Sequence, residues 1–324
     1  MKDGFGREIT YLRLSITDRC NLRCAYCMPA DGVSQFKHSD ILRLEESARL
    51  AGVLVSLGIN KIRLTGGEPL VRKNAVGLVR LLSGLKGLKG LESLQLTTNG
   101  VLLSGMAEEL KEAGLDGVNI SLDTLDNNVY RDITRGGNID LVLRGIEKAI
   151  EAGLSVRLNC VPVKGKNDEG IEALAEYAGR LGTDLRFIEL MPLGEGARYN
   201  RISSDEIYKR LAARYGEGLR SDSGDGPSVY YRFPGFESRV GFISPLSHSF
   251  CKDCNRLRLT ADGFLKLCLR HSGGIDLKAP LREGRTDREL MELIKAAVMD
   301  KPASHGFESE VSDPEQRRMI QIGG

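Results

Sequence analysis

The chain has 324 residues, of which 41% are hydrophobic and 28% are charged, and its formal net charge at pH 7 is +2. This composition is typical of a globular chain that can bury a sizeable core, and the small net charge gives no indication of a nucleic-acid partner. No stretch approaches the roughly 18 apolar residues of a membrane span, and the opening residues MKDGFG contain no apolar targeting segment. We therefore expect a cytoplasmic protein with about two domains, or one large α/β barrel with an appendage.

The first predicted strand, Leu12–Ile16, leads directly into three cysteines. Cys20, Cys24 and Cys27 have the spacing CxxxCxxC, and grouped cysteines in a reducing compartment are more typical of metal binding than of disulfides. A [4Fe–4S] cluster is normally held by four cysteines, so three on one loop would leave one iron open for chemistry. A zinc site is the alternative, although zinc sites usually pair CxxC with a second CxxC or with histidines.

The next part of the chain repeats one local pattern, in which a helix ends at a glycine and an apolar strand follows at once. Gly58, Gly114, Gly153 and Gly182 suit the left-handed position just after a helix end. Helix followed by strand, repeated, indicates a parallel sheet covered by helices, and therefore an α/β fold. Six βα units predict a partial barrel with the active site at the carboxyl ends of its strands. The six strands are predicted near Leu12–Ile16, Lys61–Thr65, Leu94–Thr97, Val118–Leu122, Val156–Val161 and Leu185–Met191.

Polar, turn-forming words follow three of these strands, as GGEP at 66–69, TTNG at 97–100 and SLD at 121–123. They are typical of the rim of an active site. Gly66 and Gly67 would let a ligand approach the backbone closely, because glycine has no Cβ. Cys160, in contrast, lies inside the fifth predicted strand and is expected to be a core residue.

Arginines alternate with apolar residues in three of the strands. Side chains of a strand point to alternate faces, so Arg13, Arg63 and Arg157 lie opposite the apolar faces. If the apolar faces pack against outer helices, these arginines point into the barrel, where an unpaired charge is costly. A polyanion such as a triphosphate would compensate them. Internal carboxylates are the alternative, and Glu189 is one candidate.

A segment rich in turn-forming residues, Ser221–Ser228, indicates a linker. We place a domain boundary there, which divides the chain into residues 1–224 and 225–324. Two short strands are predicted after it, at Val229–Phe233 and Val240–Ile243. From Pro302 onward the chain is polar and is expected to be ordered only where it docks.

A second group of three cysteines, Cys251, Cys254 and Cys268, follows these strands. With His248 or His271 as a fourth ligand it could form a zinc site. Two arginines stand directly beside it, however, and guanidinium groups bind phosphate in a fork geometry. The arginines, at 256 and 258, therefore favour anion recognition, and the alternative is that they face solvent on a strand.

The words CNLRCAYC, LTGGEP, TTNG, SLDTLD, FIELMP and CKDCNRLR occur together and in this order, and the chain ends in a diglycine. They resemble the GTP 3′,8-cyclases of molybdenum-cofactor biosynthesis, a family of radical S-adenosylmethionine (SAM) enzymes, from Arg7 to Gly324. The resemblance implies a partial, six-stranded β/α barrel at 1–224. It also implies a small C-terminal domain at 225–324 that carries a second iron–sulfur cluster and the diglycine tail.

The resemblance assigns roles to individual residues. The first [4Fe–4S] cluster, which binds SAM, is implied at Cys20, Cys24 and Cys27, and the second, which faces guanine, at Cys251, Cys254 and Cys268. The implied SAM contacts are Tyr26, Gly67, Ser121 and Met191. The implied GTP contacts are Arg13, Arg63, Thr97, Arg157, Arg256 and Arg258. Most relatives have lysine where this chain has Arg157, and the two are not interchangeable. The implied catalytic residues are Gly323, Gly324, Arg256 and Arg258.

The implied reaction begins with cleavage of SAM to a 5′-deoxyadenosyl radical that abstracts the ribose 3′-hydrogen of GTP. The product is 3′,8-cyclo-7,8-dihydro-GTP, which a pyranopterin monophosphate synthase consumes, and a homodimer is the expected assembly. A peptide-modifying radical SAM enzyme with an auxiliary cluster is the second hypothesis, and it predicts a peptide groove instead of inward arginines. A zinc-stabilised nucleic-acid-binding protein is the third, and the near-neutral charge weakens it.

Overall fold

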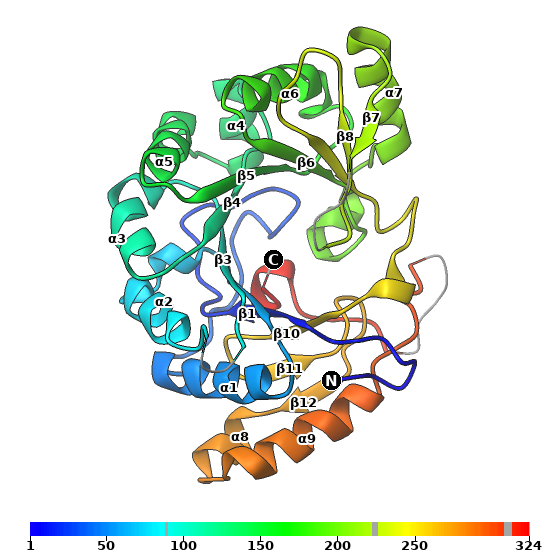
Figure 1. Cartoon of the computed structure of the whole chain (residues 1–324). Coiled ribbons are helices and arrows are strands. Elements are labelled where there is room, and N and C mark those ends of the chain that lie inside the picture. The colour runs from blue at the N-terminus through cyan, green and yellow to red at the C-terminus, as the bar shows by residue number, and fades with distance from the viewer. Residues whose placement is uncertain (88–89, 222–225, 308–312, 324) are drawn as a thin grey trace.

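The computed structural model describes residues 1–87, 90–221, 226–307 and 313–323. Over these residues the chain forms one sheet of 12 strands, and most helices cover its outer side (Figure 1). The strands are β1 (Tyr11–Ser15), β2 (Lys61–Thr65), β3 (Ser93–Thr98), β4 (Gly117–Ser121), β5 (Ser155–Cys160), β6 (Asp184–Ile188), β7 (Leu219–Ser221), β8 (Val229–Arg232), β9 (Val240–Ile243), β10 (Arg256–Leu259), β11 (Phe264–Lys266) and β12 (Gly274–Asp276). The α-helices are α1 (Leu44–Ser56), α2 (Ala75–Ser83), α3 (Ala107–Glu112), α4 (Asn127–Thr134), α5 (Ile139–Glu151), α6 (Ile171–Arg180), α7 (Ser204–Tyr215), α8 (Lys278–Arg282) and α9 (Asp287–Met299).

The six predicted strands are present as β1 to β6, in sequence order and parallel, with ends within three residues of the prediction. They form only the centre of the sheet. β10 adds to β1 and β9 adds to β6, both in parallel, and short antiparallel strands continue each edge. The sequence pattern predicted β8 and β9 as strands, but strand identity alone does not indicate which neighbour a late strand will join.

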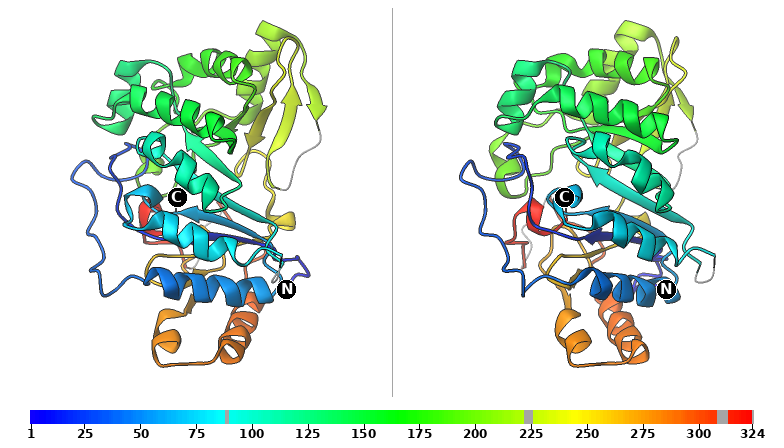
Figure 2. Two further views of the ribbon diagram at one scale, coloured as in Figure 1. Left: turned by 60° about the vertical axis from the view of Figure 1, so that its left-hand side comes forward. Right: turned by 90° about the vertical axis from the view of Figure 1, so that its left-hand side faces the viewer.

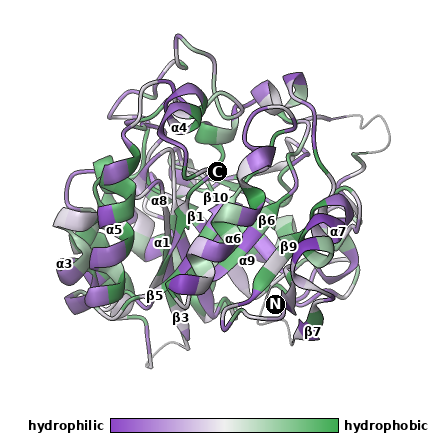
Figure 3. Ribbon diagram, turned by 90° about the horizontal axis from the view of Figure 1, so that it is seen from above, coloured by the Kyte–Doolittle hydropathy of each residue, from purple (hydrophilic) through white to green (hydrophobic). Residues whose placement is uncertain are grey.

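The core lies between the sheet and its outer helices. In β2, Ile62 and Leu64 are each 1% exposed, whereas Lys61 and Arg63 on the other face are half-buried. The predicted apolar faces of the strands therefore do pack against the helices, and Figure 3 shows hydrophilic residues on the outward sides of those helices. The predicted glycine turns are confirmed, since Gly58 and Gly114 have φ values of 100° and 96°. Cys160 is buried in the core, as predicted.

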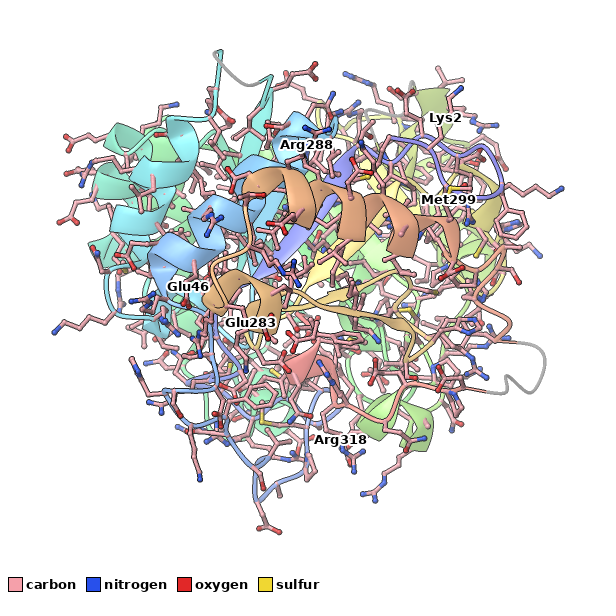
Figure 4. The ribbon with its side chains drawn as sticks, turned by 90° about the horizontal axis from the view of Figure 1, so that it is seen from below. Lys2, Glu46, Glu283, Arg288, Met299 and Arg318 are labelled. Carbon is pink, nitrogen blue, oxygen red and sulfur yellow. The ribbon has the colours of Figure 1, made fainter. Side chains whose placement is uncertain are left out.

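The underside of the molecule is closed by α8 and α9 (Figures 2 and 4). Arg282 of α8 donates to the carboxylate of Glu46 in α1 at 3.0 and 3.1 Å, and its side chain also donates to the carbonyl of Ile41. Glu46 lies close to α8 in Figure 4, and Met299 marks the far end of α9. The C-terminal segment is thus attached to the first helix of the chain.

The segment that ends at Gly323 lies within the arc of the sheet in Figure 1. Residues 313–323 lead into it, so this part of the polar C-terminal segment is docked. The proposed boundary at residues 224 and 225 lies outside the described residues, as does Gly324. Among the described helices, none is long and apolar enough to cross a membrane.

Candidate active site

A cavity of about 380 Å³ opens at the carboxyl ends of the central strands, and all six cysteines of the two triplets line it. This volume lies within the range of small-molecule sites, about 300–1,000 Å³. The structure therefore brings together two cysteine groups that are more than 200 residues apart in sequence. The sequence-predicted residues that line the cavity are Arg13, Cys20, Cys24, Tyr26, Cys27, Gly67, Thr97, Ser121, Met191, Cys251, Cys254, Arg256, Arg258 and Cys268.

The first cysteine loop follows β1 and is held from outside by α4. The amide of Ala25 donates to the carbonyl of Ile133 at 2.8 Å, and the amide of Cys27 closes a turn onto the carbonyl of Cys24 at 2.9 Å. Arg135, in the left-handed region with φ 55°, donates to the carbonyl of Met28 at 2.7 Å. These bonds curl the loop so that its cysteines face the cavity.

The two glycines after β2 have a structural role in addition to the predicted ligand contact, which stays a prediction. A Cβ on Gly67 would lie 2.3 Å from the carbonyl oxygen of Arg19, and one on Gly66 would lie 2.6 Å from that of Thr17. The amide of Gly67 also donates to Thr17 at 2.8 Å. The glycines thus permit the close approach of the cysteine loop itself, and Gly67 additionally faces the cavity.

Glu68, the next residue, connects the segment after β2 to the end of β3. Its carboxylate accepts from the hydroxyl of Thr98 at 2.9 Å and from the amides of Leu70 and Asn99 at 3.0 and 2.7 Å. Burial nevertheless raises the pKa of Glu68 to about 7, although these hydrogen bonds oppose the shift. Asn99 extends from this rim and its side-chain amide lies 3.8 Å from the sulfur of Cys20.

Tyr26 is held by Asp123, which the sequence analysis named only as part of the SLD motif after the fourth predicted strand. Its hydroxyl donates to Asp123 at 2.6 Å, and Asp123 also accepts from the amide of Val161 at 2.9 Å. The side-chain amide of Asn167 donates to the carbonyls of both Asp123 and Val161. This network connects the cysteine loop to the ends of β4 and β5, so it fixes the Tyr26 ring against the cavity wall.

The second cysteine group is held by the N-terminus of the chain. Arg7 donates to the carbonyl of Cys251 at 2.9 Å and to the carbonyls of Pro302 and Ala303 at 2.7 and 2.9 Å. The carboxylate of Asp3 accepts from Arg7 at 2.6 Å and fixes its orientation. Segments from the two ends of the chain are therefore joined beside Cys251.

A buried lysine connects the other two cysteines. Lys301 is 2% exposed, and its ammonium donates to the carbonyls of Arg256 and Leu267. Arg256 lies two residues after Cys254, and Leu267 directly precedes Cys268. The positions of the cysteine-bearing segments are thus set by hydrogen bonds to their backbone, which leaves the thiols directed at the cavity.

The chemistry of the thiols fits iron–sulfur clusters. Burial, and then nearby Cys20 and Asp123, raise the pKa of Cys27 to about 12; the pKa of Cys24 is raised well above its usual value for similar reasons. These thiols would become thiolates only beside a strong positive charge, which the iron of a cluster supplies. In the second group burial also opposes ionisation, but hydrogen bonds from His305 and Ser249 lower the pKa of Cys251 to about 7. The seven cysteines are free thiols. No three Cys, His, Asp or Glu side chains of the described chain form a site for a single metal ion.

Four cations form a row across neighbouring strands of the sheet, and two of them, Arg13 and Arg258, line the cavity. Arg63, Arg13, Arg258 and Lys266 occupy matching positions of β2, β1, β10 and β11. Residues in register on neighbouring strands share a face, and the strands lie about 4.8 Å apart. Burial, and then Arg63 and Arg256, lower the pKa of Arg13 to about 10. Like charges side by side are destabilising, so the row indicates a site for an anion.

Two of the predicted arginines do not line the cavity. Arg63 donates to Gln95 and lies over the ring of Tyr11, with 5.6 Å from its guanidinium carbon to the ring centroid. Arg157 lies 4.0 Å from Asp184, which also binds Arg239 at 2.6 Å. An internal carboxylate thus pairs with Arg157, as the alternative interpretation predicted, but this carboxylate is Asp184 and not the suggested Glu189. Glu189 instead accepts from Ser204, Leu246 and Ser247.

Arg186 is a further inward arginine that sequence reasoning missed. It is 8% exposed, and its guanidinium donates to Asn159 at 3.0 Å and to Asn119. Burial lowers its pKa to about 10. The alternation of β6 could have revealed it, because Leu185 and Phe187 flank it on the opposite face.

The end of the C-terminal tail lies against two arginines of the row, Arg13 and Arg258. The carbonyl of Gly323 accepts from Arg13 at 3.1 Å and from Arg258 at 3.3 Å. Its φ is 85°, and a Cβ there would lie 2.9 Å from the hydroxyl of Thr65, so only glycine fits without displacement. Ile320 and Ile322 are buried and anchor the preceding turn.

Family comparisons agree with this geometry. Residues 14–178 match the model of the Radical SAM superfamily, and residues 183–307 match Molybdenum Cofactor Synthesis C. The "GTP 3′,8-cyclase" of Moorella thermoacetica is 51% identical over the full length of both chains. Those of Peptoclostridium acidaminophilum and Desulforamulus reducens are 48% and 47% identical, over 99% and 100% of this chain and 98% and 100% of their own lengths.

Among solved structures, Streptococcus suis SuiB bound to S-adenosylmethionine aligns with a TM-score of 0.64 at 13% identity, over 91% of this chain and 68% of that one. SuiB bound to its precursor peptide SuiA gives a TM-score of 0.62 at 14% identity, over 98% and 71%. At these identities the likeness shows the fold alone, which is the radical SAM α/β fold. The full-length sequence relatives decide the family, and they do not favour the peptide-modifying hypothesis or the zinc-protein hypothesis. The chain belongs to the GTP 3′,8-cyclase family of radical SAM enzymes.

Proposed function

We propose that the chain converts GTP to 3′,8-cyclo-7,8-dihydro-GTP, the first step of molybdenum-cofactor biosynthesis. Family membership supports the reaction, and the row formed by Arg63, Arg13, Arg258 and Lys266 is the observation that carries the substrate assignment. Three adjacent, largely buried guanidinium groups suit a triphosphate, because each can bind phosphate oxygens through a fork of N–H donors.

Cys20, Cys24 and Cys27 would hold the first [4Fe–4S] cluster, and Cys251, Cys254 and Cys268 the second. When bound, the first cluster supplies the electron that cleaves SAM into methionine and a 5′-deoxyadenosyl radical. Tyr26, Gly67, Ser121 and Met191 would contact SAM, and their common position on the cavity wall supports this assignment. The chain's own contribution is to orient SAM between the cysteine loop and the strand ends and to exclude water from the reacting atoms.

Arg13, Arg63, Arg256 and Arg258 would bind the phosphates of GTP, with Thr97 at the wall beside them. The hydroxyl of Thr97 and Nε of Arg63 are buried without a hydrogen-bond partner among the described residues. Buried polar atoms of this kind normally have a partner, so they fit a polar ligand. Arg157 would act indirectly because Asp184 pairs with it. Gly323 and Gly324, with Arg256 and Arg258, would assist the rearrangement.

We further propose that β1 to β6 function as a six-stranded partial barrel, and that residues 1–224 and 225–324 act as the SAM and auxiliary-cluster domains. The arrangement of βα units around one cavity supports the first proposal, and the placement of the second cysteine group beyond residue 225 supports the other. Seven free thiols suit the cytoplasm. The product would pass to a pyranopterin monophosphate synthase, and a homodimer is the proposed assembly.

The decisive experiment measures 5′-deoxyadenosine from anaerobic, cluster-loaded protein with SAM and a strong reductant. It compares GTP, GTP deuterated at the ribose 3′ position, and ATP. We expect deoxyadenosine to rise with GTP, not with ATP, and to contain the deuterium. SAM cleavage that does not respond to GTP, in protein with about eight irons per chain, would retain the radical chemistry and reject the substrate.

A further inference from the structure

The row of cations across the sheet ends in a lysine whose partner comes from the C-terminal tail. Lys266 of β11 is in register with Arg258 of β10. Its ammonium pairs with the carboxylate of Glu315, and the side chains of the two residues are only 1% and 3% exposed. Lys266 also donates to the carbonyl of His271 at 2.7 Å. A buried ion pair therefore lies one strand away from the arginine that contacts Gly323.

The backbone around Glu315 is fixed on the same edge. The amide of Glu315 donates to the carbonyl of Arg270 at 2.7 Å, and Pro314 forms an antiparallel bridge with His271. The other carboxylate oxygen of Glu315 accepts from the amide of Arg317 at 2.7 Å. Glu315 thus contacts β11, the loop after it and the first turn of the tail.

Beyond Glu315 the ion pairs of the tail are longer. Arg317 lies 3.4 Å from Asp262, and Arg318 lies 3.4 Å from Glu195 of the short helix η4 (Gly194–Arg198). The Arg318 side chain is 41% exposed and its partner Glu195 is 3% exposed, so solvent screens this pair more than it screens the pair of Lys266 and Glu315. Arg318 is labelled at the outer surface in Figure 4. The buried pair is consequently the strongest candidate for the contact that fixes where the tail begins.

We infer that Lys266 and Glu315 are positioning residues for the diglycine end of the chain. Seven residues separate Glu315 from Gly323, so an end fixed at Glu315 confines the carbonyl of Gly323 to the neighbourhood of Arg13 and Arg258. Without that anchor, ordering the same segment requires the loss of more conformational freedom. Only the kinetic part of this inference rests on the proposed function.

The test uses the full-length, cluster-loaded protein and the variant Glu315→Gln, which keeps the shape of the side chain but loses its charge. A second variant, Lys266→Met with Glu315→Leu, removes both charges, so neither is left buried alone. Glu172→Gln is the matched control, because it removes the ion pair with Arg210 between α6 and α7. Hydrogen–deuterium exchange of residues 316–323 is the primary readout.

We expect exchange of residues 316–323 to rise about tenfold in both variants, as loss of one charge-assisted hydrogen bond predicts. Exchange in β2 and β3 should be unchanged, and the Glu172→Gln control should leave the tail protected. Unchanged tail exchange, or a rise of equal size throughout the chain, would reject the inference. This readout requires no substrate, so it remains valid if the GTP assignment fails.

Cyclic product formation supplies a second readout that a purely structural role would not give. Glu315→Gln should reduce turnover about tenfold, and a chain truncated after Glu315 should be reduced at least as much. In the truncated background, Glu315→Gln should have less than about a twofold further effect, because there is no tail left to position. An equal reduction in both backgrounds would show that Glu315 acts independently of the tail.

Discussion

The guanidinium of Arg258 donates to the carbonyl of Gly323 at 3.3 Å, although the two residues are 65 positions apart in the chain. Arg258 is also part of the cation row, in register with Arg13. The same side chain therefore contacts the diglycine tail and belongs to the proposed phosphate site. The tail and the substrate would therefore share one guanidinium group, so a substitution of Arg258 would affect both.

Replacing the central cation of the row should stabilise the cluster-free protein and weaken GTP binding. Arg13 lies between Arg63 and Arg258, and its lowered pKa of about 10 reflects burial and repulsion. A pKa of Arg13 lowered to about 10 corresponds to a destabilisation of the charged group by about 3 kcal/mol, and lost packing in Arg13→Met offsets part of the gain from its removal. We expect a small increase in melting temperature together with about a 10–100-fold loss of GTP affinity, since hydrogen bonds to charged groups contribute about 1.5–3 kcal/mol.

Calorimetric titration with GTP and thermal unfolding of the same sample check this prediction. Arg13→Lys is the control, because it keeps a charge while losing the fork geometry. A variant that is both less stable and unchanged in GTP affinity would contradict the role assigned to the row.

Removing the hydroxyl of Tyr26 should affect SAM more than GTP. Tyr26→Phe eliminates the 2.6 Å hydrogen bond to Asp123, which orients the ring beside the first cysteine loop. We expect the KM for SAM to rise about tenfold, with a smaller change in kcat. Tyr208→Phe is the control, since it removes a hydroxyl bond to Glu217 far from the cavity. An effect confined to the KM for GTP would exclude this positioning role.

Arg7 should be needed for the second cluster but not for the first. Its side chain holds the carbonyl of Cys251 together with those of residues 302 and 303. In Arg7→Met we expect iron to fall from about eight to about four atoms per chain, because each [4Fe–4S] cluster contains four. Arg282→Met is the control, because it removes similar bonds on the underside of the molecule. Retention of all eight irons in Arg7→Met would be the contrary result.

Stability of the cluster-free chain should fall as the pH rises through 7 because of Glu68. Its folded pKa of about 7 lies above the ordinary value of 4.5, so between these values the folded state binds more protons than the unfolded state. The contribution of Glu68 to stability is therefore complete below about pH 4.5 and declines up to and beyond pH 7.

Urea unfolding at about pH 5.5 and pH 8 tests this shift. The wild-type chain should lose about 2 kcal/mol more than Glu68→Gln over this interval, because the glutamine does not titrate. Parallel pH profiles for the two proteins would mean that the carboxylate is ionised throughout.

Periodicity predicted the central strands well because their apolar residues alternate with polar ones and glycines mark the helix ends. It also predicted that the Arg13 side chain points to the inner face, where it lines the cavity. It could not predict that Arg157 faces Asp184, because that pair depends on the register of β5 against β6. The same limit applies to the partners of β9 and β10, which are set by long-range pairing instead of local pattern.

Most of the site residues that sequence motifs suggested reach one cavity, whereas Arg63 and Arg157 do not line it. The residues that hold the cavity residues in place were not predicted. Arg7 and Lys301 act on backbone carbonyls, and an interaction of that kind leaves no pattern in the sequence. In the sequence, Asp123 and Glu68 were recognised only as members of the SLD and GGEP motifs. Their partners, Tyr26 and Thr98, became clear only when the strand ends were placed together.

The place of β1 in the sheet has a consequence for how the protein is made. β1 pairs with β2 on one side and with β10 on the other, and Tyr11 meets Arg256 only 245 residues later in the chain. During synthesis the β10 side of β1 therefore stays open until almost the whole polypeptide has left the ribosome. Pairings this distant in sequence form slowly. The first cysteine loop is complete long before the second, so the nascent chain could receive its first cluster while the binding site for its second does not yet exist.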